Sequence, residues 1–421
     1  MDARIPPPLL LLLLLLSALQ VLSIALAETT PDLAMASDVG GNGDQLRLVH
    51  VAALFRHGER ASLTTFPGDP NQHYVWPMGR GQLTNRGRQT MYALGKWLRE
   101  RYARFLTHDV REVRARSSPV PRCFDSVAIL LYGLYPAVDK ERQWKHGQDW
   151  QPVAIMSPPD GTDKYATLCL PRFLESLSAL YATEVPCSLV DKRLPQPQTE
   201  TAAPRRFATA GSILDFVATV ANVTDKPGVA RFAATSRIVD ALFVNHENGL
   251  PLPEWGTKHI RQLFWLNEML VEFIGKYQKD NMAGALLKDF VASMKPAHAG
   301  GGVMLTQGQD ETNKGPKVTL YSYHDMNVAG AIVGLNGTLS GRPSYGAAII
   351  LEVFARSGTS DAAADKFVRL LYKLSNQHAT SIPVEGCADP CPLQKFDQIL
   401  ERKFKPVTRA QCGWSEHQPL L

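Results

Sequence analysis

The sequence predicts an α/β fold in which two strands bring histidines to the same edge of a sheet. Residues 46–55 are mostly apolar, as expected for a strand buried on both faces, and they lead into Arg-His-Gly-Glu-Arg. A second strand-like segment, residues 318–323, leads into His-Asp, and a packed helix is expected behind it at 326–335. Ligands of open α/β sheets bind just beyond the carboxyl ends of the strands, so both histidines are candidate site residues.

The turn after the first strand places His57 between Arg56 and Arg60. An imidazole between two guanidinium groups is suited to meet an anion such as a phosphate. The same residues are also compatible with a charged, solvated turn. His324-Asp325 at the end of the second strand favours a site, because two strands that each end in a histidine are much less expected by chance than one.

Between these strands we expect an amphipathic helix at residues 89–106, where apolar side chains recur every three or four positions, with Thr84 as its N-cap. A short strand at 110–115 then leads to Arg116. Ser118 is predicted to cap the next helix, with Pro119 at the first helical position. An arginine at a strand end, just before a helix, suits a phosphate oxygen.

The pattern from about residue 140 to 276 is helical, with Pro-rich breaks such as 195–204. Helices are expected at 172–183, 207–222, 229–243 and 257–276. Another helix at 281–294 and a polar loop lead back to the second strand, and strands at 345–354 and 367–372 complete the sheet. The predicted organisation is an α/β domain of residues 45–139 and 277–421, with residues 140–276 as a helical cap over the strand ends.

Composition limits the classes of function. The 421 residues are 45% hydrophobic and 20% charged, enough for one large domain or two. The net charge is only +5, with 45 basic and 40 acidic residues well mixed, so we expect no nucleic-acid partner.

The amino-terminal residues 1–27 are predicted to be a secretory signal peptide, because leucine fills positions 9–16 and small residues precede the cleavage position. An uncleaved anchor is the alternative, since the apolar stretch approaches the length that spans a bilayer. Residues 28–44 are polar and Gly-rich and are expected to form a flexible leader. The carboxyl end is polar, so no membrane span is expected after signal removal.

The chain resembles the histidine acid phosphatases, the branch of the histidine phosphatase superfamily that includes prostatic and lysosomal acid phosphatases. Four motifs carry the resemblance, in the family's order: Arg56-His57-Gly58-Glu59-Arg60, Gly81-Gln82-Leu83-Thr84, Arg116-Ser117-Ser118 with Arg122, and His324-Asp325. The resemblance implies a phosphoglycerate-mutase-like three-layer sandwich with a mostly helical inserted cap domain. It also implies hydrolysis of phosphomonoesters, which include peptide and lipid phosphates.

The chemistry expected from this resemblance centres on His57, whose neutral imidazole would attack phosphorus and form a phosphohistidine that water hydrolyses. Asp325 would donate a proton to the leaving alcohol and later help to activate the water; a donor must be protonated, so an acidic optimum is expected. The phosphoryl oxygens would be surrounded by Arg56, Arg60, Arg116 and His324. No metal or other cofactor is expected, because the cations are all side chains.

Several positions depart from the family pattern. Pro119 replaces an aspartate, Ser62 stands where many relatives have proline, and Glu59, which borders the leaving-group side, replaces Asp or Ala. A phytase-like inositol-phosphate phosphatase is one alternative, but it favours a very basic pocket that the sequence does not show. A catalytically silent secreted binding protein is another, although it is expected to have lost site residues. A mutase of the superfamily is expected to lack a signal peptide.

Six cysteines in a secreted chain suggest disulfides. The resemblance implies the pairs Cys387–Cys391 and Cys169–Cys412, while Val244 and Ala347 occupy the positions of a third family bridge. The two remaining cysteines are expected to pair with each other: Cys123 and Cys187. Glycosylation is expected at the sequons of Asn222 and Asn336. The predicted location is extracellular, or alternatively the lysosomal lumen, and a homodimer is possible because relatives are often dimers.

Overall fold

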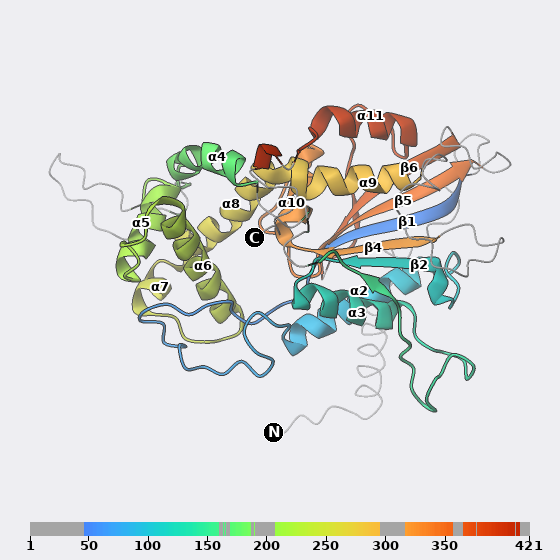
Figure 1. Ribbon diagram of the computed structural model, residues 1–421, viewed down its shortest axis with the longest axis horizontal. Helices are drawn as coiled ribbons and strands as arrows, with labels where there is room; N and C mark the ends of the chain where they lie inside the picture. Colours follow the sequence, from blue (N-terminus) through green and yellow to red (C-terminus); the bar gives the residue numbers. More distant parts are fainter. Residues whose placement is uncertain are drawn as a thin grey trace, which may run out of the picture.

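A computed structural model describes residues 46–159, 163, 165, 169–186, 189, 207–294, 316–356, 365–375, 377–408 and 410–412. The expected signal peptide and leader lie outside these residues. Within the described part, a mixed sheet is covered by helices on both faces, and a second group of helices lies beyond one end of the sheet (Figure 1).

The central strand of the sheet is β1 (Leu46–Arg56). It pairs in parallel with β4 (Val318–Tyr323) and antiparallel with β5 (Ala348–Arg356). The full strand order is β3-β2-β4-β1-β5-β6-β7, with β8 paired to β6. The remaining strands are β2 (Val113–Ser117), β3 (Ile155–Met156), β6 (Lys366–Lys373), β7 (Thr380–Ser381) and β8 (Cys391–Pro392). Because β1, β4 and β2 run parallel side by side, their carboxyl ends meet at one edge.

Strand β1 is mostly apolar, and both of its faces are buried from His50 to Arg56. Ala53 and Phe55 belong to a core shared with α2 (Asn85–Arg101) and α3 (Pro121–Leu134). Ala52 and Leu54 belong to the core on the opposite face, under α9 (Ala285–Ser293), α10 (Asp325–Gly334) and α11 (Leu393–Lys403). Figure 1 shows these two helical layers on either side of the sheet. The predicted three-layer α/β sandwich is confirmed.

The second group of helices has a hydrophobic core of its own. Its members are α4 (Leu170–Ala182), α5 (Ala210–Val220), α6 (Gly228–Glu247), α7 (Glu254–Lys258) and α8 (Ile260–Lys279). Helix α8 continues through a π-helical turn, Asp280–Gly284, into α9 of the sandwich. One nearly continuous helical path therefore joins the helical group to the sheet (Figure 1).

Two predicted helix starts have different outcomes. Thr84 caps α2 as expected, and its side chain accepts a hydrogen bond from the Gly87 amide. Helix α3 does not begin at Ser118 and Pro119; its N-cap is Val120 and its first residue is Pro121. The cause is that the Ser118 amide still donates to the Ser322 carbonyl, so the chain remains extended beside β4 through that residue.

The two disulfides implied by the family pattern are present, Cys169–Cys412 and Cys387–Cys391. The expected pairing of Cys123 with Cys187 is wrong, because Cys123 is free and buried. It lies on the first turn of α3 with its sulfur 3.8 Å from the Tyr323 carbonyl oxygen, inside the sandwich. Cys187 lies outside the described residues.

Both expected glycosylation positions are exposed. Asn222 and Asn336 follow helices, with φ angles of 52° and 63°. In the described part of the chain, no helix is both long and apolar enough to cross a bilayer.

Candidate active site

Two neighbouring parallel strands bring the two histidines together. Arg56 is in register with Tyr323, so His57 and His324 are the next residues of β1 and β4. The His57 amide donates to the Tyr323 carbonyl at 2.9 Å. The two imidazole rings lie 5.6 Å apart, edge to face. The prediction that the strand ends deliver both histidines to one edge agrees with this geometry.

His57 is buried, and its hydrogen bonds define its tautomer. Its Nδ1 lies 2.8 Å from the Gly58 carbonyl oxygen, which can only accept, so Nδ1 carries the proton. The lone pair is therefore on Nε2, toward which Arg122 Nε donates at 3.1 Å. Burial, followed by Arg122 and Arg56, holds the pKa of His57 well below its usual value. The imidazole is neutral, and its Nε2 lone pair faces the guanidinium group of Arg122.

The glycine after His57 lets the turn pack against helix α2. A Cβ at Gly58 would lie 2.6 Å from the Gly87 carbonyl oxygen, closer than real Cβ contacts. Glu59 then turns toward the start of α2, where Thr84 donates to it at 2.8 Å and Arg86 forms an ion pair with it. These contacts fix the turn that carries His57.

Arg56 and Arg60 are both almost fully buried at the same edge. Arg56 Nη1 donates to the Pro343 carbonyl at 2.7 Å, and its guanidinium carbon lies 3.8 Å from the centre of the Tyr345 ring. Arg60 Nη2 donates to Asp240 of α6 at 2.7 Å. Among the described residues, the buried Nε atoms of both arginines have no hydrogen-bond partner. These two N–H groups are free to bind an anion.

Asp325 begins helix α10 and is held by arginines. Its Oδ2 lies 2.7 Å from Arg342 Nε, 2.6 Å from Arg342 Nη2 and 3.1 Å from Arg56 Nη2. Its Oδ1 accepts the Met326 amide at 2.9 Å. Burial raises the pKa of Asp325, but Arg342 and Arg56 outweigh it and hold the pKa well below its usual value. Asp325 is therefore a carboxylate in this structure.

His324 completes the cluster from the end of β4. Its Nε2 lies 3.2 Å from Ser118 Oγ and 4.0 Å from Cys123 Sγ. Burial, followed by Arg122, lowers the pKa of His324 to about 3, so the ring is neutral. The charged groups around the histidines are four guanidinium groups and two carboxylates: Arg56, Arg60, Arg122, Arg342, Asp240 and Asp325. This excess of positive charge at the start of helices α3 and α10 favours an anionic ligand.

Known proteins match this chain along most of its length. Residues 47–373 match the histidine phosphatase superfamily (branch 2). The chain belongs to this family. Rat prostatic acid phosphatase is 29% identical over 395 residues, which cover 90% of this chain and 93% of that protein. Bovine lysosomal acid phosphatase is 27% identical over 366 residues, which cover 83% and 77%. The family expected from the four motifs is confirmed.

Solved structures agree on the fold. Hafnia alvei phytase in complex with myo-inositol hexakis sulphate has a TM-score of 0.56 and 16% identity, covering 89% of this chain and 99% of that one. Citrobacter braakii phytase has a TM-score of 0.55, also at 16% identity, covering 87% and 99%. The chain has the fold of the histidine phosphatases.

In this histidine phosphatase the arginine beside His57 is Arg122, and not Arg116 as the sequence predicted. Arg116 is one-third exposed and its Nε donates to the Tyr323 hydroxyl at 3.1 Å, while its guanidinium carbon lies 4.9 Å from the centre of the Tyr165 ring. Arg122, on the first turn of α3, is the arginine that contacts His57. The signal was present in the sequence, because Pro121 marks the first helical position and places Arg122 at the helix start.

Arg342 is the second site residue that sequence reasoning missed. It lies in the loop between α10 and β5, outside the four motifs, and only the folded loop brings it to Asp325. Among the described residues, no group of three His, Cys, Asp or Glu side chains is placed to hold a metal ion.

Proposed function

We propose that this chain is an acid phosphatase that hydrolyses phosphomonoesters through a phosphohistidine on His57. One observation carries the proposal: the Nε2 lone pair of a buried, neutral His57 faces a cluster of guanidinium groups. A neutral imidazole can attack phosphorus and divide one difficult displacement into two easier steps.

Three arginines and one histidine are proposed to bind the phosphoryl oxygens. The unpartnered Nε groups of Arg56 and Arg60 and the Nε of Arg122, with His324 beside them, support this assignment. Their donors are fixed before the substrate arrives, so they stabilise transition-state charge without reorganisation. Arg122 replaces Arg116 in this proposed set, because Arg116 contacts Tyr323 instead.

Asp325 is proposed to handle protons on the leaving-group side. As a carboxylate it can accept a proton from the water that attacks the phosphohistidine, and after protonation it can donate to a leaving alcohol. Its lowered pKa means that only acidic solutions protonate an appreciable fraction of it. The lowered pKa of His57 keeps the nucleophile neutral in the same pH range. The lowered pKa values of Asp325 and His57 both favour activity at acidic pH.

The relatives and the sequence support an acid phosphatase over the alternatives. Curated relatives are named prostatic, lysosomal and testicular acid phosphatases, whereas the phytases share only the fold at 16% identity. A silent binding protein does not need an ordered nucleophile and free anion donors. We also propose secretion or residence in the lysosomal lumen, which the predicted signal peptide and the exposed sequons support.

We propose that the helical group caps the site. Asp240 of α6 pairs with Arg60 and Arg342, and this contact between the two parts supports the proposal. We place the start of the proposed cap at α4 and not near residue 140, and the pairing of β3 with β2 in the sheet supports this placement.

We propose a homodimer that buries the edge of the sheet at β3. Large apolar side chains are exposed beside this edge, with 64% of Trp144, 55% of Val138, 45% of Met156 and 39% of Trp150 accessible. A short edge strand with exposed aromatic neighbours is suited to pairing with a second copy. Light scattering would detect the dimer, and Trp150→Ser is expected to weaken it.

The decisive experiment measures phosphate release from an aryl phosphate, from acidic to neutral pH, without added metal. We expect activity at acidic pH that His57→Ala abolishes. His146→Ala is the matched control, because His146 is exposed on a loop away from the cluster, and it is expected to retain activity. A folded wild-type protein that turns over no aryl, lipid or inositol phosphate would instead indicate a binding protein.

A further inference from the structure

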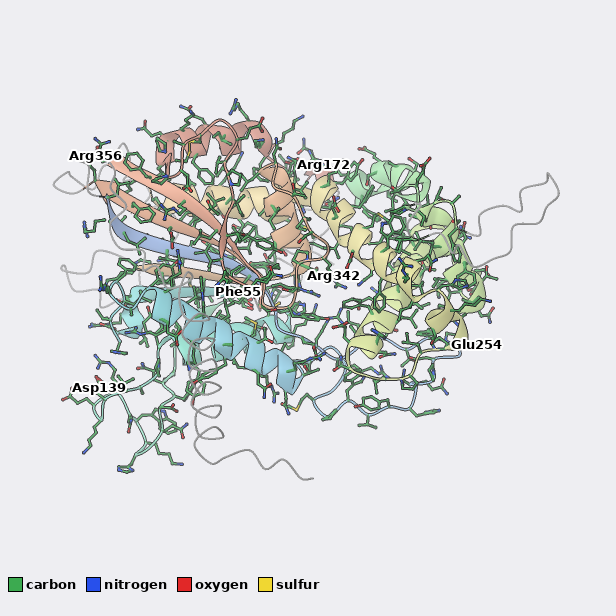
Figure 2. The ribbon with its side chains drawn as sticks, turned by 180° about the vertical axis from the view of Figure 1, so that it is seen from behind. Phe55, Asp139, Arg172, Glu254, Arg342 and Arg356 are labelled. Atoms are coloured by element: carbon green, nitrogen blue, oxygen red, sulfur yellow. A yellow bond between two sulfur atoms is a disulfide. The ribbon has the colours of Figure 1, made fainter. Side chains whose placement is uncertain are left out.

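Arg342 connects the proposed proton-handling residue to the helical cap. Its Nε and Nη2 both reach Asp325 Oδ2, at 2.7 and 2.6 Å. Its Nη1 lies 3.2 Å from Asp240 Oδ1 of α6 and donates to Asn267 Oδ1 of α8 at 3.1 Å. Only 9% of the side chain is exposed. Figure 2 shows Arg342 between the end of the sheet, near Phe55, and the helical group. Partners on three elements therefore hold Arg342 in place.

These contacts favour the carboxylate form of Asp325. The two carboxylate oxygens accept hydrogen bonds from Arg342 Nε at Oδ2 and from the Met326 amide at Oδ1, and Arg56 Nη2 forms an ion pair with Oδ2. A proton on Oδ2 would have to displace a guanidinium hydrogen. While Arg342 stays in place, the protonated form of Asp325 is disfavoured, so the residue is a better proton acceptor than donor.

The other charged groups around Asp325 leave its ion pair with Arg342 in place. The groups that face it or its arginines are Arg56, His57 and Arg60 at the end of β1, Arg122 of α3, Asp240 of α6 and Glu268 of α8. Asp240 is shared between Arg60 and Arg342, so it holds both in position. Glu268 is farther out, and burial, partly offset by Arg342, raises its pKa.

We propose that Arg342 is a specificity-determining residue that makes this phosphatase prefer phosphomonoesters whose leaving group departs without a proton from the enzyme. The preferred class contains aryl and enol phosphates, and the disfavoured class contains alkyl phosphates such as those of sugars, inositols and serine. This inference rests on the proposed phosphatase function and goes beyond it, because it names the substrate class.

The two steps balance without a donated proton in the first. His57 Nε2 forms a bond to phosphorus while the bond to the leaving oxygen breaks, and the electron pair departs on a stabilised phenolate or enolate. Water then attacks the phosphohistidine, the N–P bond breaks, and Asp325 accepts the proton of the water and later returns it to solvent. An alkoxide is too basic to leave in this way, so alkyl esters require the protonated acid that Arg342 disfavours.

The first test uses the wild-type protein alone. The value of kcat/KM is measured for a series of aryl phosphates with increasing leaving-group pKa and for alkyl phosphates such as glycerol phosphate. We expect a steep decrease along the series and a much lower value for the alkyl esters. Comparable kcat/KM for aryl and alkyl esters would overturn this inference while leaving the phosphatase function intact. Inactivity toward every ester would instead overturn the proposed function.

The second test removes the guanidinium group. In Arg342→Met we expect the pKa of Asp325 to rise by about one to three units, which is the effect of one adjacent arginine. The ratio of alkyl to aryl kcat/KM should rise at least about tenfold, since each unit is a tenfold change in the protonated fraction. Arg342→Lys retains a positive charge and should restore part of the wild-type ratio.

A matched control separates this effect from the loss of any buried arginine. Arg101 forms a buried ion pair with Glu352, with side-chain exposures of 9% and 0%, away from the site. Arg101→Met is expected to leave the alkyl-to-aryl ratio unchanged. An unchanged ratio in a folded Arg342→Met protein would overturn the inference. If that variant does not fold, the wild-type series decides the matter.

Discussion

At the scale of single residues, the assignment of the site depends on which of two arginines contacts His57. Arg122 donates to His57 Nε2 at 3.1 Å, whereas Arg116, six positions earlier, donates to the Tyr323 hydroxyl at 3.1 Å. The Arg122 guanidinium also contributes to the low pKa of His57. Arg122 therefore acts on His57 in two ways, through its hydrogen bond and through its charge, whereas Arg116 contacts Tyr323.

We predict that Arg122→Met lowers kcat/KM for an aryl phosphate by about a hundred- to a thousandfold, the usual effect of removing one fixed donor to a transition-state oxyanion. The acid limb of the pH–rate profile of the residual activity should also shift to higher pH. Without Arg122 the pKa of the His57 imidazole rises, so the ring protonates more readily. Steady-state kinetics across acidic pH measure both changes. Arg116→Met is the control, and a larger loss in that variant would restore the original assignment.

The sequence was sufficient to place five site residues, because each is fixed by a strand end. Arg56 is the last residue of β1, His57 and Arg60 follow it, and His324 and Asp325 follow β4, so the parallel register brings these residues together. The two missed arginines depend on other geometry. Arg122 reaches the site because α3 starts two residues later than the serine and proline suggested, and Arg342 reaches it through the fold of a long loop.

At the scale of elements, helices α2 and α3 pack closely against each other in the layer beneath the site. A Cβ at Gly95 of α2 would lie 2.1 Å from the Leu130 carbonyl oxygen, and a Cβ at Gly133 of α3 would lie 2.5 Å from the Tyr92 carbonyl oxygen. The two backbones therefore touch where each helix has a glycine. Helix α3 also carries Arg122, so this packing positions the guanidinium at His57.

We predict that Gly95→Ala destabilises the protein, by about 1 to 3 kcal/mol, although alanine is the better helix former. The added methyl group must push the helices apart because it meets backbone. Urea unfolding measures the change in free energy. Ala93→Gly, at an exposed position of the same helix, is the control and should cost about 1 kcal/mol from helix propensity alone. A stabilised Gly95→Ala protein would contradict the packing.

Elements were predictable where one local signal dominates. The apolar runs gave β1, β4 and β5, and the periodicity gave α2, with its cap at Thr84. The short edge strand β3 and helix α11 were not expected, since two residues carry no periodicity and α11 lies in a cysteine- and proline-rich region. Their formation depends on neighbours that are distant in the sequence.

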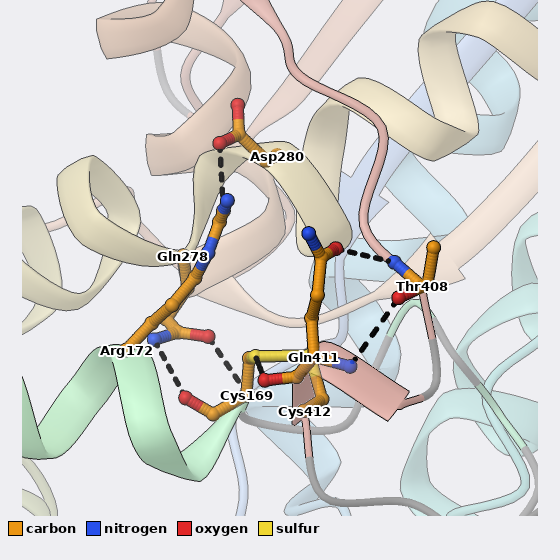
Figure 3. The surroundings of a disulfide bond; sticks show 7 residues. All are labelled: Cys169, Arg172, Gln278, Asp280, Thr408, Gln411 and Cys412. Carbon is orange, nitrogen blue, oxygen red and sulfur yellow. Dashed lines mark hydrogen bonds and ion pairs between the residues drawn. A yellow bond between two sulfur atoms is a disulfide. The ribbon is translucent and has the colours of Figure 1, made fainter.

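At the scale of the whole molecule, the Cys169–Cys412 disulfide ties the helical group to the carboxyl-terminal segment. Cys169 is the N-cap of α4, and its amide donates to Oε1 of Gln278 on α8 at 2.8 Å. Beside it, Arg172 of α4 pairs with Asp280 of the π-helical turn at 2.8 Å. Figure 3 shows this junction, where residues of α4 and α8 lie beside Thr408, Gln411 and Cys412.

We predict that replacing both Cys169 and Cys412 by serine destabilises the protein much more than replacing both Cys387 and Cys391. The bridges span sequence separations of 243 and 4, so the first restricts the unfolded chain far more. The chain-entropy relation gives a loss of about 5 kcal/mol against about 2 kcal/mol. Denaturant unfolding without reductant measures both. Equal losses would contradict this prediction and would mean that other contacts already hold the long loop closed in the unfolded state.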